Sequence, residues 1–230
     1  GGMKGDYLDD GYFELIRHVV REAERIGLKY WIYDEYNWPS GIAGGYLIKE
    51  KPWTRMRNLC AFSDVVQPGA ALRKSVPFAE KTKLELLGGV AIKENERTRI
   101  EPQILGDEIV WVNNEDVPVT AYIFLTMLHT GVLPCSRGAE FTWNQEYFGT
   151  TLKGVFTDEV AAVSYGSPEM AGMLLTLPWS RKFEQKFKEQ RGYDVCDILP
   201  MLFIDSDDVD TARARYDYWL TVRDMYINAY

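Results

Sequence analysis

The sequence contains few histidines and cysteines, the residues from which many metal sites and nucleophilic catalytic sites are built. It contains two histidines, His18 and His129, and three cysteines that lie far apart. A zinc site built from several histidines is therefore excluded, and no cysteine spacing matches a metal-binding motif. A Ser-His-Asp triad would have to recruit one of the two histidines. An odd number of distant cysteines also gives no reason to expect disulfides.

Long apolar runs and an excess of basic residues are also lacking. No stretch approaches the roughly 18 apolar residues that a membrane-spanning helix requires, and the N-terminus has no basic-then-apolar signal segment. The net charge of -8 argues against a nucleic-acid surface, which would gather Lys and Arg. We therefore expect neither a nucleic acid nor a membrane as partner. The apolar fraction of 46% is enough to fill a substantial core.

The chain begins with an amphipathic helix that leads directly into a short apolar strand. Residues 9–26 place apolar side chains along one helical stripe, between an acidic N-cap and a terminating glycine. Residues 28–33 (LKYWIY) have the length and apolar character of a parallel strand buried on both faces. Trp31 is therefore expected in the core. The strand ends directly at Asp34 and Glu35.

A second apolar strand ends in the same way. Residues 152–157 (LKGVFT) precede Asp158 and Glu159, so the motif of the first strand recurs. In parallel α/β barrels the loops after the strands gather at one face, where substrates bind. We therefore expect the two acidic pairs to meet at one site. Taken singly, each aspartate could instead cap the turn that follows it, with its glutamate solvated.

The middle and the last third of the chain have different patterns. Residues 57–127 consist of short alternating segments, such as 108–112 and 119–124, separated by polar turns. This pattern predicts antiparallel β structure. In the last third, residues 183–190 and 210–230 have the apolar spacing and flanking signals of helices.

Together these patterns predict an α/β fold, a partial (β/α)8 TIM-type barrel with an inserted antiparallel β subdomain. Residues 1–56 would form the first part of the barrel, residues 57–127 the β-rich insertion, and residues 128–230 the continuation of the barrel, truncated at the C-terminus. A full barrel takes roughly 250 residues. We expect a fragment, because 230 residues that include such an insertion cannot hold eight βα units.

Two carboxyl groups at one site are what cleavage of a glycosidic bond requires. One protonates the leaving oxygen, and the other attacks the sugar or activates a water molecule. Glu35 and Glu159 are the candidate catalytic pair. The neighbouring Asp34 and Asp158 are candidates for binding substrate or for helping to hold a cation.

The loop after the first strand adds side chains suited to sugars. Tyr36, Asn37 and Trp38 follow the first acidic pair, and they join the two aspartates as candidate substrate-binding residues. Flat aromatic rings can stack on the apolar faces of pyranose rings. Trp38 is the best stacking candidate, because it lies beyond the predicted strand.

Three blocks of the sequence resemble a known family. Residues 33–45 (YDEYNWPSGIAGG) resemble a signature of bacterial glycoside hydrolases related to family 106, the α-L-rhamnosidase group. Residues 149–160 (GTTLKGVFTDEV) are similar to a second block of that family, with Val160 where a proline is usual. Residues 187–203 and 215–219 are similar to a third. The resemblance covers most of the chain outside the β insertion.

The resemblance implies a (β/α)8 catalytic domain that cleaves an oligosaccharide or polysaccharide by carboxylate general acid/base catalysis, with Glu159 as the general acid. It also implies that Asp34 and Glu35 bind substrate or a cation, and it suggests calcium as a cofactor. The partner carboxylate could lie on a later strand beyond Tyr230. Residues 127–148 depart from the family pattern, which has a longer helix-containing stretch there, and this puts the geometry of Glu159 in question.

Two other function classes stay open. An incomplete barrel would favour a non-catalytic carbohydrate-binding module or a degenerate barrel. A divalent-cation hydrolase that uses the four carboxylates as ligands is also chemically feasible, because hard cations prefer carboxylate oxygens. The sugar, its anomer, retention or inversion, the oligomeric state and the cellular location do not follow from the sequence.

Overall fold

The computed structural model describes residues 6–33, 50–51, 57–75, 84–94, 96–128, 145–156 and 173–228. The chain divides into two compact units, each formed from two separate stretches. The smaller unit comprises Gly1–Arg55 and Val132–Ala161, and the larger unit comprises Met56–Gly131 and Ala162–Tyr230. The chain therefore leaves each unit and returns to it once.

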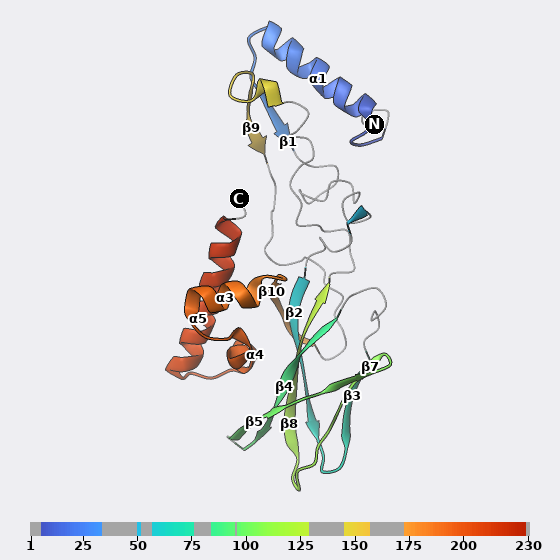
Figure 1. Cartoon of the computed structure of the whole chain (residues 1–230), viewed down its shortest axis with the longest axis vertical. Helices are drawn as coiled ribbons and strands as arrows, with labels where there is room; N and C mark the ends of the chain where they lie inside the picture. The colour runs from blue at the N-terminus through green and yellow to red at the C-terminus, as the bar shows by residue number, and fades with distance from the viewer. Residues whose placement is uncertain are drawn as a thin grey trace. The chain divides into compact units, whose positions relative to one another are not determined.

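In the smaller unit a helix accompanies two parallel strands (Figure 1). Its elements are α1 (Asp10–Arg25), β1 (Tyr30–Tyr33), the 3-10 helix η4 (Gln145–Tyr147) and β9 (Leu152–Phe156). Arg21 of α1 donates a hydrogen bond to the hydroxyl of Tyr147 at 3.2 Å. This contact links the helix to the segment that leads into β9.

Antiparallel strands form the body of the larger unit. The five-stranded sheet has the order β10 (Met173–Trp179), β2 (Arg57–Val66), β8 (Val119–Leu128), β4 (Glu85–Lys93) and β5 (Glu96–Ile100). The three-stranded sheet has the order β3 (Ala71–Ser75), β7 (Glu108–Val112) and β6 (Gln103–Leu105). Every strand pairing in both sheets is antiparallel.

The five-stranded sheet has a hydrophobic core on each face, because successive residues of a strand point to opposite sides. Leu59 of β2 belongs to a core that also contains Phe187 of α3 (Phe183–Arg191). Its neighbour Cys60 belongs to a second core, which includes Ile109 of the three-stranded sheet. The larger unit thus consists of three layers: helices, five-stranded sheet and three-stranded sheet.

Aromatic rings join the helical layer to the sheet. The helices are α3, η5 (Val195–Ile198), α4 (Leu199–Phe203) and α5 (Val209–Ile227). Phe183 lies with its ring centroid 4.7 Å from that of Trp179 and 5.1 Å from that of Tyr218. The Tyr218 hydroxyl donates a hydrogen bond to the carbonyl oxygen of Pro178, and burial raises the pKa of Tyr218. The polar end of this buried ring is therefore satisfied, as burial requires.

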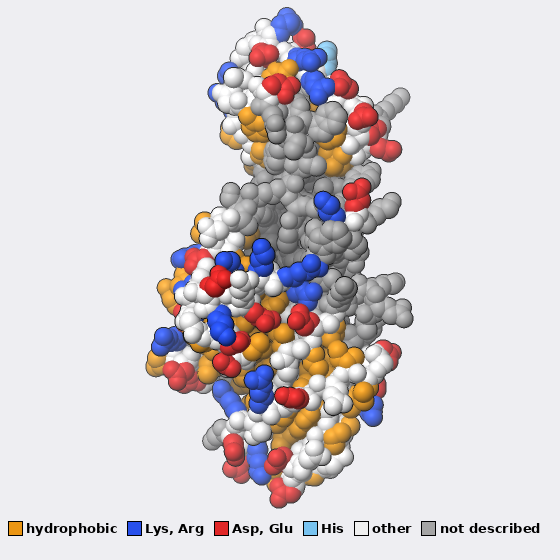
Figure 2. Space-filling view, viewed as in Figure 1, with side chains coloured by type: hydrophobic (Ala, Val, Ile, Leu, Met, Phe, Trp, Pro, Cys, Tyr) orange, Lys and Arg blue, Asp and Glu red, His pale blue; other side chains and the backbone are white. Residues whose placement is uncertain are grey.

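The surface of the larger unit mixes both signs of charge. Figure 2 shows acidic and basic side chains interspersed over the visible face, with apolar side chains between them. No helix among the described residues is long and apolar enough to cross a bilayer.

The helices and strands predicted along the described residues are confirmed. The helices expected over residues 9–26, 183–190 and 210–230 correspond to α1, α3 and α5, with shifted ends. The strands expected over residues 28–33 and 152–157 correspond to β1 and β9. The antiparallel β structure expected within residues 57–127 is also present.

The predicted (β/α)8 TIM-type barrel is wrong. That fold requires eight parallel strands, each followed by a helix. Among the described residues, β1 with β9 is the one parallel pair of strands, and the other pairings form open antiparallel sheets. The helices predicted over 183–190 and 210–230 cover the five-stranded sheet instead of flanking barrel strands. The strand and helix patterns are local signals, and they did not specify which strands pair.

Candidate functional site

The two strands that precede the acidic pairs lie side by side, although they are far apart in the sequence. Tyr33, the last residue of β1, is paired with Phe156, the last residue of β9. Trp31 is paired with Gly154 in the same register. Because the strands are parallel, their carboxyl ends lie at the same edge of the pair. The chain therefore leaves both strands from neighbouring points.

One face of this strand pair is aromatic and open to solvent. Trp31, Tyr33 and Phe156 are 61%, 47% and 55% exposed, whereas Ile32 between the first two is 4% exposed. The rings of Tyr33 and Phe156 meet edge to face, with centroids 5.1 Å apart. We call these three side chains the aromatic face. Its exposed rings are available to a ligand with an apolar surface.

A glycine sets how closely the Trp31 indole approaches the strand pair. A Cβ atom at Gly154 would lie 2.5 Å from Cζ3 of Trp31 and 2.9 Å from Cε3. Real side chains essentially never approach so closely, so a side chain at position 154 would require the indole to move. A glycine inside a strand often marks such a close approach. The six-membered part of the indole therefore packs against Gly154 of the partner strand.

The predicted site residues follow these strand ends in the sequence but lie outside the described residues. This holds for the candidate catalytic Glu35 and Glu159. It also holds for the candidate substrate-binding residues, which are Asp34, Asp158, Tyr36, Asn37 and Trp38. The nearest described positions are Tyr33, which directly precedes Asp34, and Phe156, which lies two residues before Asp158.

The described residues hold no metal centre. Among them, no group of three or more His, Cys, Asp or Glu side chains could bind a metal ion. The carboxylates to which the resemblance assigns calcium lie outside this part of the chain. His18 is exposed on α1, and His129 lies outside the described residues.

The two described cysteines are unsuited to nucleophilic chemistry. Cys60 and Cys196 are both free thiols. Burial raises the pKa of Cys60 to about 12, and burial together with nearby Glu184 and Asp194 raises that of Cys196 to about 12. Since the thiolate is the reactive form, both groups stay protonated and inert near neutral pH.

The expectation that Trp31 is buried in the core is wrong. The strand was expected to be covered on both faces, but its Trp31 side carries exposed rings. Two signals in the sequence could have identified the aromatic face. Aromatic residues alternate with Ile32 at strand spacing, and Gly154 interrupts an apolar strand that ends in Phe156.

Comparison with known proteins gives no further assignment. No protein-family model, no curated protein and no solved structure matches this chain.

Proposed function

We propose that this chain is a glycoside hydrolase, or a piece of one, that binds its sugar at the carboxyl ends of β1 and β9. The observation that carries the proposal is the parallel register of the two strands, with Tyr33 opposite Phe156. Two acidic motifs that are far apart in the sequence can act on one glycosidic bond only if the fold brings them close together, and the pairing of β1 with β9 does this for the strands that precede them.

Only a few residues separate the two strand ends from the proposed catalytic carboxylates. Paired strands lie about 4.8 Å apart, and each further residue extends the chain by at most about 3.8 Å. Glu35 follows Tyr33 by two residues, and Glu159 follows Phe156 by three. The carboxyl groups of known glycosidase pairs are about 5 to 9.5 Å apart. Such a separation is within reach of side chains that start from adjacent strand ends.

The proposed roles follow from the chemistry of the reaction. Glu159 acts as the general acid that protonates the leaving oxygen, and Glu35 is the second carboxylate. Asp34 and Asp158 bind the substrate or a cation beside them. Tyr36, Asn37 and Trp38 complete the binding site as substrate contacts.

The aromatic face supports a sugar as the ligand. Trp31, Tyr33 and Phe156 are exposed directly before the two acidic pairs. Exposing large rings to water is unfavourable, and stacking on the apolar face of a sugar removes part of that cost. We therefore add Trp31 to the proposed substrate contacts.

The proposal is tested by hydrolysis of a panel of 4-nitrophenyl glycosides that includes the α-L-rhamnoside. In the active protein, Glu159→Gln should lower kcat by at least about 100-fold, because general acid catalysis contributes roughly 100- to 10,000-fold. The unfolding midpoint should stay unchanged. Glu24→Gln, which removes an exposed carboxylate from α1, is the matched control. Wild-type turnover in the Glu159→Gln variant would remove this residue from the mechanism.

A non-catalytic carbohydrate-binding module is the second candidate, and the exposure of the aromatic face favours it. It predicts saccharide binding without hydrolysis. Titration of sugars against tryptophan fluorescence should show binding that Trp31→Ala weakens about fivefold or more, a change of about 1 kcal/mol. Binding without any turnover, in a protein with normal unfolding, would favour this candidate over the hydrolase.

A further inference from the structure

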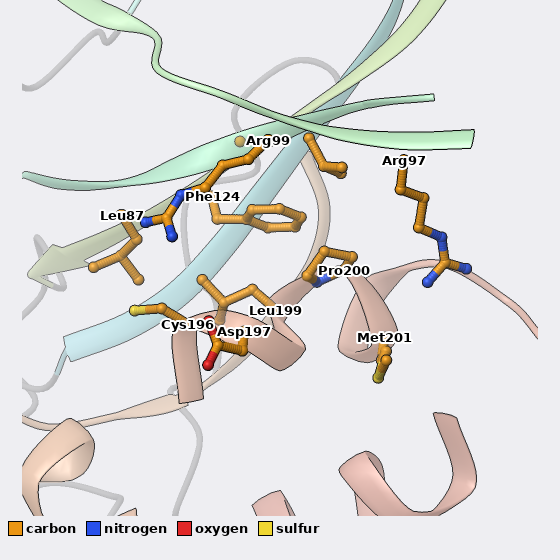
Figure 3. A pocket seen from close by; sticks show the side chains of 11 residues that line it. Leu87, Arg97, Arg99, Phe124, Cys196, Asp197, Leu199, Pro200 and Met201 are labelled. Atoms are coloured by element: carbon orange, nitrogen blue, oxygen red, sulfur yellow. The ribbon is translucent and has the colours of Figure 1, made fainter. Parts of the chain in front are cut away.

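The larger unit contains a cavity that is lined by residues of that unit alone (Figure 3). It has a volume of about 280 Å³ and lies between the edge strand β5 and the short helices η5 and α4. Its lining includes Arg97 and Arg99 of β5, Phe124 of β8, and Leu199 and Met201 of α4. The volume suits a ligand smaller than a typical drug, for which pockets start at about 300 Å³.

Two arginines give the cavity its positive charge. Arg97 and Arg99 are two residues apart on one strand, so both side chains leave the same face of the sheet. Neither has a hydrogen bond or an ion pair with another side chain among the described residues, although Arg97 is close enough to Asp208 to help lower the pKa of that carboxyl group. In Figure 3 they lie toward opposite ends of the cavity, with Phe124 between them. Each guanidinium therefore keeps its hydrogen-bond donors available for an anion.

The middle of the cavity is apolar. Phe124 and Leu199 are 2% and 1% exposed, and both belong to the core between helices and sheet. Leu87 and Met201 pack against the same core and line the cavity as well. A ligand that crosses from one arginine to the other would pass over this apolar floor.

The remaining polar residues leave the cavity with a net positive charge. Asp197 is the one acidic residue among the eleven that line it, so the lining itself carries a formal charge of +1. Carboxylates lie just outside the lining, with Glu184 and Asp194 near Cys196 and Asp208 near Arg97. Cys196 adds no negative charge, because burial and nearby carboxylates raise the pKa of its thiol to about 12. The two guanidinium groups in the lining, and not the net charge of the region, are what favours an anionic ligand.

We propose that this cavity binds an aliphatic dicarboxylate, with one carboxylate at Arg97, the other at Arg99 and the methylene chain over Phe124. Hydrogen bonds between a guanidinium and a carboxylate are charge-assisted, which makes them stronger than neutral ones, and the pair often forms two such bonds. The apolar floor matches the chain between the two charged ends. This site is independent of the proposed glycosidase activity.

Isothermal titration with suberate, octanoate and octanamide tests the proposal on the whole chain. The three probes have the same carbon count and carry two, one and no carboxylates. Suberate should bind at least about tenfold more tightly than octanoate, because a tenfold difference corresponds to one modest charge-assisted contact. Octanamide, which carries no carboxylate, should bind more weakly than octanoate. Arg97→Met and Arg99→Met should each remove the preference for suberate, because methionine keeps the apolar part of the arginine side chain but lacks the guanidinium.

The control is Arg213→Met, which removes an exposed arginine from α5 outside the cavity. It should retain the preference for suberate, and unfolding midpoints should show that all three variants fold. Equal affinity for suberate and octanoate, a preference that survives both cavity variants, or no binding of suberate would each overturn the proposal. Loss of the preference in Arg213→Met would also overturn it, because net charge alone would then explain binding.

Discussion

At the scale of single residues, the geometry of the aromatic face depends on the absence of a side chain at Gly154. The Trp31 indole lies where a Cβ atom at Gly154 would come within 2.5 Å of it. Gly154 is not in the left-handed region, so the position of the indole, and not the backbone conformation, is what a larger residue would disturb here. The geometry of the face is therefore sensitive to one methyl group.

Gly154→Ala should displace the Trp31 indole and weaken sugar binding about fivefold or more, as loss of one stacking contact would. Tryptophan fluorescence and near-ultraviolet circular dichroism report the displacement, and sugar titration reports the affinity. Gly11→Ala is the control, because a Cβ there meets ordinary contacts at 3.4 Å and alanine favours the helix. Unchanged indole signals in Gly154→Ala would show that the ring does not depend on this glycine.

A second residue-scale prediction concerns Asn113, which is fully buried between β7 and β8. Its amide donates to the carbonyl oxygens of Val66 at 2.9 Å and Val117 at 3.0 Å, and its side-chain oxygen accepts from the N–H of Glu115 at 2.9 Å. Asn113→Ala leaves these backbone groups unpaired, and each such group costs about 1 to 3 kcal/mol.

Urea unfolding should therefore show that Asn113→Ala lowers the free energy of unfolding by at least about 2 kcal/mol. The adjacent Asn114 is exposed, so Asn114→Ala should change it by less than about 0.5 kcal/mol. Equal effects of the two substitutions would contradict the role of the Asn113 hydrogen bonds.

At the scale of elements, α5 begins at a cap that titrates. The Asp208 side chain accepts hydrogen bonds from the Ser206 hydroxyl and, at 2.6 Å and 2.9 Å, from the N–H and hydroxyl of Thr211. These bonds, with that of Ser206 the largest cause, lower the pKa of Asp208 to about 2. A lowered pKa means that the charged form stabilises the folded state.

The resulting stability is present above the ordinary pKa of 3.8 and is lost as the pH falls towards 2. Over this window the unfolding midpoint of the wild type should fall more steeply than that of Asp208→Asn, whose cap cannot titrate. Asp210→Asn in the first turn of α5 is the control and should follow the wild-type slope. Parallel curves for the wild type and Asp208→Asn would contradict the titrating cap.

The positions of the helices and strands were easier to predict from the sequence than the pairing of the strands. The stripe in residues 9–26 and the short apolar run before Asp34 are local patterns, and both elements are present. Residues 57–62 of β2 are all buried, as in a parallel strand, but here an antiparallel strand has helices on one face and a second sheet on the other. Such a sequence does not distinguish the two cases. The topology depends on contacts between distant residues, which local spacing does not encode.

At the scale of the whole molecule, the two acidic motifs matter only if the chain brings them together. The sequence indicated that both follow apolar strands, and the structure pairs those strands in parallel at Tyr33 and Phe156. The aromatic face beside them was not predicted, because Trp31 was assigned to a core that would need cover on both sides. The cavity at Arg97 was not predicted either, since it depends on where β5 and α4 meet.

The distance between the carboxyl groups of Glu35 and Glu159 in a crystal structure tests the proposed function most directly. We predict a separation within about 10 Å beside the aromatic face, with about 5 Å indicating retention and about 6.5 to 9.5 Å indicating inversion of the anomeric carbon. A separation well beyond this range, or carboxyl groups on opposite faces of the β1 and β9 pair, would contradict their role as a catalytic pair.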